Sequence, residues 1–330
     1  MISKLDVRVS AEGGIGLGAW LFLPKGDGAH PAITMAHGFA GTREHGLERF
    51  ARAFATAGFV VLVHDHRNFG TSGGDLRGDV DPWVQIRDWR RAISYLEARP
   101  EVDPARIGLW GTSYAGGHAL VLGATDRRLR CIVSQVPTIS GYEQGLRRVS
   151  PDALPALEHA FNEDERAQSH GEPPHRQAVV SGDLSVPAAY RSQDAINFYL
   201  QPIPAGVWEN DITICSTRAA RMYEPGNWIT RVSPTPLLAG CRARRQAGGR
   251  RPGTCGLCAC AGAETARPDT GWPLRSLSRP VSAGGSGRNR MVSRAPAQSE
   301  REPSVTPNGT RDAFAAVNCD IANLPQHQRV

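Results

Sequence analysis

One serine of this chain stands where an apolar strand is expected to turn sharply into a helix. Ser113 lies in the run Ile-Gly-Leu-Trp-Gly-Thr-Ser-Tyr-Ala-Gly-Gly that spans residues 107–117. A tight strand–turn–helix of this kind, a nucleophile elbow, lifts a serine hydroxyl out of the edge of a sheet. Serine is a poor nucleophile at neutral pH, so its attack on an acyl carbon also requires a base and fixed donors for the oxyanion. The pattern predicts acyl chemistry at Ser113.

The elbow departs from the usual G-x-S-x-G pattern at its last position. Ala115 stands where glycine is usual, and Gly116 and Gly117 follow it. Small residues are needed at both ends because the strand and helix backbones pass close together at the turn. The apolar run over residues 106–110 favours a strand before the turn. The alternative interpretation is an ordinary strand-to-helix turn with a solvated serine.

Strands and helices alternate along the first 136 residues. Apolar runs predict strands over residues 15–23, 31–36, 59–63, 106–110 and 131–136. Helical spacing of apolar residues predicts helices over residues 44–57, 83–96 and 115–124. The run over residues 59–63 is apolar throughout, as in a strand buried on both faces. The alternation predicts an α/β protein with a mostly parallel, doubly wound sheet.

Three polar residues come just beyond the ends of predicted strands. They are His37, Asp65 and Ser113. Reactive groups of parallel sheets lie at the carboxyl ends of the strands. We therefore expect these three side chains to gather along one edge of the sheet.

Two further motifs accompany the elbow. One is the loop His-Gly-Phe at residues 37–39, and the other is the run Asp-His-Arg-Asn-Phe-Gly-Thr-Ser-Gly-Gly at residues 65–74. With these motifs, residues 1 to about 238 resemble the α/β-hydrolase superfamily. Within it, the chain is similar to dienelactone-hydrolase-like and X-prolyl-peptidase-like acyl hydrolases and to the fungal polyketide-transferase group. The resemblance implies an α/β-hydrolase fold with an inserted helical cap.

The resemblance also implies roles for individual residues. The backbone N–H groups of Phe39 and Tyr114 would hold the oxyanion, which fixed donors stabilise by a few kcal/mol each. His37 is expected to support its loop by hydrogen bonding rather than to act in catalysis. The run that begins at Asp65 is expected to be mainly architectural.

The predicted domain division has four parts. Residues 1–136 form the core with the elbow, residues 137–231 a helical cap, residues 232–238 the start of a late core strand, and residues 239–330 an irregular or disordered tail. Helix-like pieces over residues 155–166 and 188–200 favour the cap. The alternative for that segment is a set of ordinary surface helices.

The base and the acid of a catalytic triad are not located by the sequence. In α/β-hydrolases the chain order is serine, acid, histidine. The histidines after the elbow are His118, His159, His170, His175 and His327. His118 is expected to point away from Ser113, the next three lie in the predicted cap, and His327 is a weak candidate for the base. The late aspartates, which follow no strand-like run, are Asp269, Asp312 and Asp320.

The composition changes abruptly at about residue 239. Residues 1–238 carry 24 Lys and Arg against 26 Asp and Glu, whereas residues 239–330 carry 14 Arg against 6 acids. Such an Arg-, Gly-, Ala- and Pro-rich segment with few aliphatic residues does not readily bury a core. We hypothesise that it comes from a shifted reading frame of a GC-rich gene. A zinc site at Cys255, Cys258 and Cys260 and nucleic-acid binding by the arginines are disfavoured alternatives.

The function predicted from the sequence is a serine hydrolase that cleaves or transfers an acyl group of an ester or thioester. The alternative is a catalytically impaired hydrolase-fold protein that lacks the triad acid and histidine. We expect a small-molecule acyl substrate, no metal or organic cofactor, no nucleic acid and no membrane partner. No secretory signal or membrane-spanning run is visible, so a cytoplasmic location is expected. The oligomeric state stays open, and an exposed sheet edge predicts poor solubility.

Overall fold

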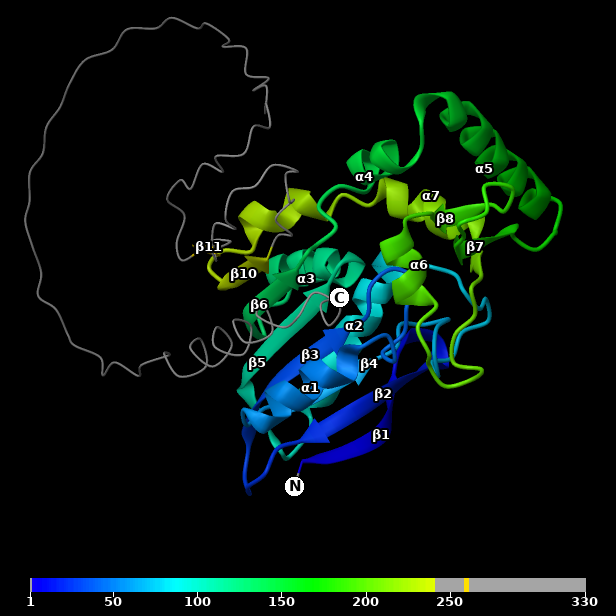
Figure 1. The fold of residues 1–330 in the computed structure, drawn as a ribbon. Helices are drawn as coiled ribbons and strands as arrows, with labels where there is room; N and C mark the ends of the chain where they lie inside the picture. The colour runs from blue at the N-terminus through cyan, green and yellow to red at the C-terminus, as the bar shows by residue number, and fades with distance from the viewer. Residues whose placement is uncertain (1, 241–257, 261–330) are drawn as a thin grey trace, which may run out of the picture.

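A computed structural model describes residues 2–240 and 258–260 of the chain (Figure 1). Its main sheet has the strand order β1-β2-β4-β3-β5-β6-β10-β11. The strand bounds are β1 Ser3–Ser10, β2 Gly16–Leu23, β3 His30–Ala36, β4 Val60–His64, β5 Val102–Thr112, β6 Leu129–Gln135, β10 Leu237–Gly240 and β11 Cys258–Cys260. Strands β4, β3, β5, β6 and β10 run parallel, while β1, β2 and β11 pair antiparallel with their neighbours. The mostly parallel sheet expected from the sequence is confirmed.

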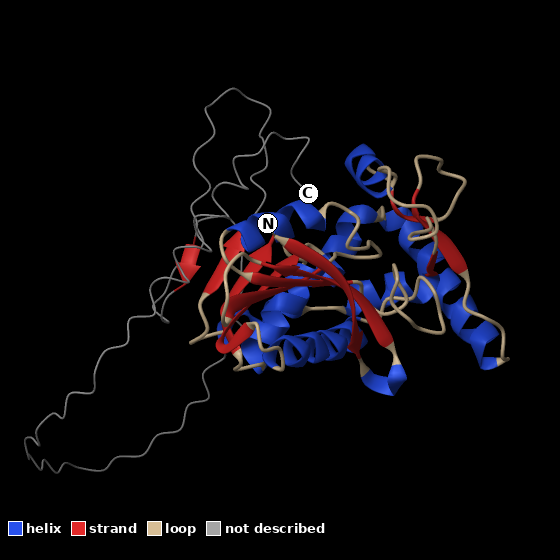
Figure 2. Ribbon diagram, turned by 90° about the horizontal axis from the view of Figure 1, so that it is seen from below, coloured by secondary structure: helices blue, strands red, loops and turns tan. Residues whose placement is uncertain are grey.

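Helices cover both faces of the sheet (Figure 2). They are α1 Leu47–Thr56, α2 Pro82–Glu97 and α3 Tyr114–Thr125. Alternate residues of β4 enter two different cores. Val61 and Val63 pack with α1, whereas Val60 and Leu62 pack with α2 and α3. The strand is therefore buried on both faces, as its unbroken apolar run predicts.

Residues 137–222 lie beyond the carboxyl ends of the parallel strands, and residues 225–231 pack against α3 (Figure 1). Residues 137–231 contain both helices and strands. The elements are α4 Gly141–Arg148, η2 Pro151–Ala153, α5 Leu154–Ser169, β7 Arg176–Val180, β8 Ala188–Tyr190, α6 Gln193–Tyr199, β9 Ile212–Thr213, α7 Ile214–Met222 and η3 Pro225–Arg231. The strands form a small sheet in the order β8-β7-β9. The cap is thus not purely helical, and its boundaries stay a prediction.

One predicted helix of the cap is wrong in its first half. Residues 188–200 were expected to be helical, but residues 188–190 form β8, and α6 begins only after Ser192. The Ser192 hydroxyl accepts a hydrogen bond from the Ala195 N–H at 3.3 Å and caps the helix there. Residues 188–190 pair with β7 instead, so their backbone groups are hydrogen-bonded within a sheet. The local sequence does not reveal this pairing.

The predicted late strand joins the main sheet. Strand β10 pairs in parallel with β6, and Leu237 lies opposite Ile132. The strand continues to Gly240, two residues beyond the expected end, and β11 then pairs with it within the segment expected to be irregular. His327, the three late aspartates and nearly all of the segment ascribed to a shifted frame, from about residue 239 onward, lie outside the described residues, as do the side chains of the zinc-site cysteines. No helix in the described part of the chain is long and apolar enough to cross a membrane.

Candidate active site

Ser113 occupies a strained corner between β5 and α3. Its φ of 55° and ψ of −117° lie outside the regions that L-residues ordinarily adopt, and its side chain is exposed. A Cβ at Gly111 would lie 2.2 Å from the Ala115 carbonyl oxygen, so the turn requires glycine there. The Ser113 N–H donates to the Gln135 carbonyl and the Thr138 N–H donates to the Ser113 carbonyl, both at 2.9 Å. These bonds hold the corner in place.

The loop after β3 passes directly beside this serine. A Cβ placed on Gly38 would lie 3.2 Å from the Ser113 Cβ and 3.5 Å from its hydroxyl oxygen. The Phe39 and Tyr114 rings meet edge to face, with centroids 5.4 Å apart. Tyr114 begins α3, where backbone N–H groups have no partner within the helix. Within the described residues, neither the Phe39 nor the Tyr114 N–H donates a hydrogen bond.

His37 supports the loop through both ring nitrogens. Its Nε2 accepts the His66 N–H at 2.9 Å, so its Nδ1 carries the proton and donates to the Gly38 carbonyl at 2.9 Å. That carbonyl and the Phe39 N–H belong to the same peptide unit, which is planar. Burial lowers the pKa of His37 to about 4. His37 is therefore neutral near pH 7 and orients the Phe39 N–H.

Two side chains of residues 137–231 hold the next part of the same loop. The Tyr199 hydroxyl donates to the Phe39 carbonyl, and the Trp208 Nε1–H donates to the Ala40 carbonyl at 2.7 Å. Ala40 has a φ of 50°, which is unusual for a residue with a side chain. His45 packs against both aromatic rings. The loop conformation thus depends on residues far away in the chain.

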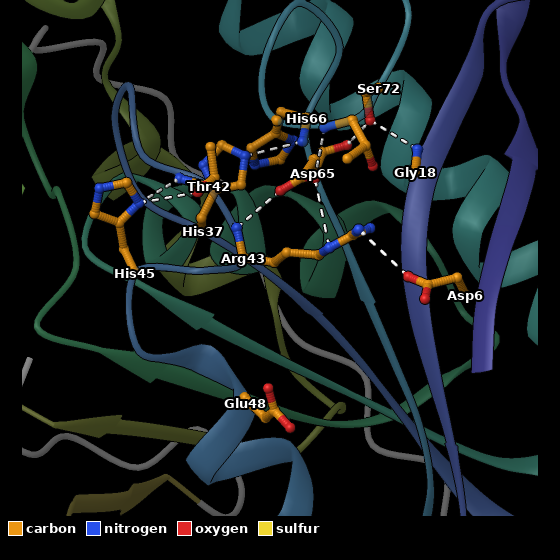
Figure 3. Close-up of polar contacts among 12 residues, drawn as sticks. Asp6, Gly18, His37, Thr42, Arg43, His45, Glu48, Asp65, His66 and Ser72 are labelled. Atoms are coloured by element: carbon orange, nitrogen blue, oxygen red, sulfur yellow. Dashed lines mark hydrogen bonds and ion pairs between the residues drawn. The ribbon is translucent and has the colours of Figure 1, made fainter. Parts of the chain in front are cut away.

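Asp65 organises the neighbouring loop (Figure 3). Its carboxylate accepts the Arg43 N–H at 2.8 Å and the Thr71 N–H at 3.1 Å. Ser72 donates its hydroxyl to the Asp65 carbonyl at 2.7 Å and accepts the Gly18 N–H at 2.9 Å. Burial raises the pKa of Asp65, and the Arg43 cation opposes this shift. Asp65 therefore acts on backbone groups rather than on Ser113.

The other residues of this run also have structural partners. Arg67 forms a two-pronged ion pair with the buried Asp88, at 2.7 and 2.9 Å. Gly70 has a φ of 52°, and a Cβ there would lie 2.2 Å from an Asp65 carboxylate oxygen. The geometry agrees with the architectural role that the resemblance implies for the run.

His118 faces the protein interior. Its Nε2–H donates to the Gln85 side-chain oxygen, and its Nδ1 accepts the Tyr223 hydroxyl, both at 2.9 Å. Burial lowers the pKa of His118 to about 3. The ring is fully buried whereas Ser113 is exposed, so His118 is not positioned as its base.

The cap histidines form no hydrogen bond with Ser113 in the described structure. His159, His170 and His175 are exposed, and His159 pairs with Glu163 at 3.0 Å on its own helix. No hydrogen bond to the Ser113 hydroxyl occurs within residues 2–240. The base and the acid are thus not found among the side chains that the structure describes.

A cavity opens next to Phe39 and Tyr114. Its volume is about 640 Å³ with the space at its mouth included. It is lined by Phe39, Tyr114, Thr138, Gly141, Gln144, Gly145, Arg148, Val149, Leu157, Gln177, Ala188, Ala189, Tyr190, Thr217, Ala220 and Arg221. Across the described part of the chain, no three His, Cys, Asp or Glu side chains are grouped so as to hold a metal ion.

Comparison with known proteins decides the family. The family model described as X-Pro dipeptidyl-peptidase (S15 family) matches residues 13–179. The chain belongs to the S15 family. The quorum-quenching protein AidA of Acinetobacter baumannii is 32% identical, over 72% of this chain and 78% of the relative. The thiohydrolase apmlB of Arthrinium phaeospermum is 31% identical, over 68% of this chain and 74% of the relative.

Solved structures confirm the fold of this S15-family chain. The α/β-hydrolase GrgF from a Penicillium species superposes with a TM-score of 0.61 and 25% identity, over 72% of this chain and 79% of GrgF. The complex of DcsB with its substrate analogue gives a TM-score of 0.63 at 24% identity, with 72% and 79% of the two chains covered. The chain has the α/β-hydrolase fold, and its relatives place it among acyl hydrolases.

The sequence does not indicate that several residues belong to the site of this S15-family chain. Tyr199, Trp208, Arg148 and Arg221 stand in no motif, and only the folded cap brings them to the loop and the cavity. The polar run over residues 144–148 gives no local sign that one of its arginines lines a pocket.

Proposed function

We propose that this chain is a serine hydrolase that cleaves or transfers an acyl group of an ester or thioester through an acyl-enzyme on Ser113. The observation that supports it is the juxtaposition of an exposed, strained serine with two backbone N–H groups that have no acceptor among the described residues. Donors fixed before the reaction stabilise a developing oxyanion without reorganisation.

The proposed chemistry follows from this geometry. The Ser113 hydroxyl oxygen attacks the acyl carbon, and the carbonyl oxygen becomes an anion that accepts the Phe39 and Tyr114 N–H groups. Collapse of this intermediate expels an alcohol or thiol and leaves the acyl group on Ser113. Water or a second nucleophile then takes the acyl group. A base must remove the serine proton and then give it to the departing alcohol or thiol.

The second candidate is a hydrolase-fold protein that binds acyl compounds with little turnover. It is favoured by the lack of any histidine bonded to Ser113 among the described residues. A protein without its triad histidine keeps only the part of the rate that the oxyanion donors and binding supply.

A serine-directed fluorophosphonate probe separates the two candidates. The enzyme is expected to label rapidly, and Ser113→Ala is expected to abolish labelling because it removes the hydroxyl at the elbow. Ser134→Ala is the matched control, since its buried hydroxyl bonds the Gly116 carbonyl at 2.7 Å. Slow labelling of the unsubstituted chain supports the impaired protein. Labelling that persists in Ser113→Ala contradicts both.

A further inference from the structure

Two arginines face the cavity beside the proposed oxyanion donors. Arg148 comes from the last turn of α4 and Arg221 from the last turn of α7. The cavity lining contains no aspartate or glutamate. In a partly enclosed space, two cations without an acid produce a positive potential that attracts anions.

One guanidinium nitrogen of Arg221 is buried. Its side chain lies over Gly145, where a Cβ would be 2.6 Å from the Arg221 Nη1. This Nη1 is buried and has no hydrogen-bond partner among the described residues. A buried charged donor without an acceptor is costly, so an anion in the cavity would be stabilised by it.

Arg148 lies on α4, one turn after the Gly145 that Arg221 covers. Its guanidinium carbon lies 4.5 Å from the Tyr190 ring centroid, and its Nη2 donates to the Gln144 side-chain oxygen at 3.2 Å. Both partners line the cavity as well. They fix the planar guanidinium while leaving it without an acidic partner in the described structure.

Neighbouring arginines of the same helices behave differently. Arg147 on α4 pairs with Glu143 at 3.9 Å, and Arg218 on α7 pairs with Glu165 at 3.1 Å. No ion pair is found for Arg148 or Arg221 within residues 2–240. On α4 and α7, the two arginines without an ion pair are thus the two that line the cavity.

We propose that the substrate carries an anionic group, a carboxylate or a phosphate, which Arg148 and Arg221 bind. The inference deepens the proposed function and rests on it for the position of the reacting carbonyl, which would lie against the N–H groups of Phe39 and Tyr114. The guanidinium fork suits the two oxygens of a carboxylate or a phosphate. The anion would belong either to the acyl part or to the leaving group.

Binding of a ketone that cannot be hydrolysed tests the acyl side. By titration calorimetry, the full-length chain is expected to bind 5-oxohexanoate at least about tenfold more tightly than the uncharged 2-hexanone. Arg221→Gln and Arg148→Gln are each expected to remove most of this preference. Arg221→Lys keeps the charge and is expected to retain part of it. Arg147→Gln, the matched control on α4, is expected to keep all of it.

Coenzyme A tests the leaving-group side, because its phosphates lie on the thiol that departs. The affinity for coenzyme A falls about tenfold in both glutamine variants if the anion belongs to the leaving group. In that case the chain binds 5-oxohexanoate no more tightly than 2-hexanone. Equal binding of the two ketones together with no arginine-dependent binding of coenzyme A overturns the inference. The inference is also overturned if Arg147→Gln loses as much anion binding as the two cavity variants. None of these ligands requires turnover, so absent labelling of Ser113 would reject the proposed function without removing the anion preference.

Discussion

At the scale of single residues, His37 shows how a buried imidazole can serve a reaction without exchanging a proton. Its two hydrogen bonds fix one tautomer and one orientation of the Gly38–Phe39 peptide. Burial keeps it neutral by lowering its pKa to about 4. The sequence suggests a supporting role for this histidine, but only the structure shows which backbone group it holds.

His37→Ala is expected to slow fluorophosphonate labelling of Ser113 by about tenfold to a hundredfold. The variant leaves the Gly38 carbonyl without its ring donor, so the Phe39 N–H loses its fixed direction. The same variant is expected to lose about 1–3 kcal/mol of unfolding free energy in urea, because the His66 N–H is left unpaired. His159→Ala, at an exposed position of α5, controls for loss of a histidine. An unchanged labelling rate in a folded His37→Ala protein would rule out the positioning role.

Buried histidines also predict a pH dependence of stability. Burial lowers the pKa of His37 and His45 to about 4, and that of His64 and His118 to about 3. Between these values and pH 6.5 the unfolded chain binds more protons than the folded one. Stability should therefore fall as the pH drops below 6.5, by at most about 1.4 kcal/mol per pH unit for each histidine.

Urea unfolding at pH 7.5, 6.5, 5.5 and 4.5 measures this dependence. Asp65 works in the opposite direction, because its raised pKa lets the folded state take up a proton at low pH. Above about pH 7.5 the histidines contribute almost no slope, because they are neutral in both states. An unfolding free energy that stays constant from pH 6.5 to 4.5 would contradict the prediction.

At the scale of elements, the cap and the loop after β3 form one unit. The Tyr199 hydroxyl at the end of α6 bonds the Phe39 carbonyl across a separation of 160 residues. Trp208 bonds the next carbonyl of the same loop. The segment that closes over the cavity therefore also sets the conformation of a proposed oxyanion donor.

Tyr199→Phe removes one hydroxyl of this unit and keeps the aromatic ring. A neutral hydrogen bond contributes about 1 kcal/mol, so labelling of Ser113 is expected to slow about fivefold. Tyr142→Phe is the control, because Tyr142 on α4 is exposed. Stopped-flow labelling with a fluorescent probe measures both. Equal rates for the two variants would show that the loop keeps its shape without the cap hydroxyl.

At the scale of the whole molecule, the described sheet ends in β11 on one side and β1 on the other. Strand β10 supplies the start of the late core strand after which α/β-hydrolases carry the acid. Beyond Gly240 lies the basic segment whose composition suggests a shifted reading frame.

Restoring the alternative frame after residue 238 is expected to raise hydrolysis of p-nitrophenyl acetate by about a thousandfold or more, because an acid and a histidine would complete the triad. Resequencing the gene is the control for this prediction. An uninterrupted frame through codon 330, confirmed on an independent template, would remove the hypothesis. Equal esterase rates of the two versions would also contradict it.

The sequence by itself determined the features that depend on near neighbours. The apolar run over residues 59–63 predicts a strand buried on both faces, and the small residues around Ser113 predict a close strand-to-helix turn. The gathering of His37, Asp65 and Ser113 at one sheet edge follows from the parallel order of the strands. Each of these depends on spacing within a few residues or on chain order.

The tertiary structure alone decided which distant side chains complete the site. The strand at residues 188–190 exists because β7 lies beside it, and the local sequence favours a helix there. Tyr199, Arg148 and Arg221 reach the loop and the cavity because the cap folds back over the strand ends. Contacts between residues so far apart depend on the path of the whole chain, which no local spacing encodes.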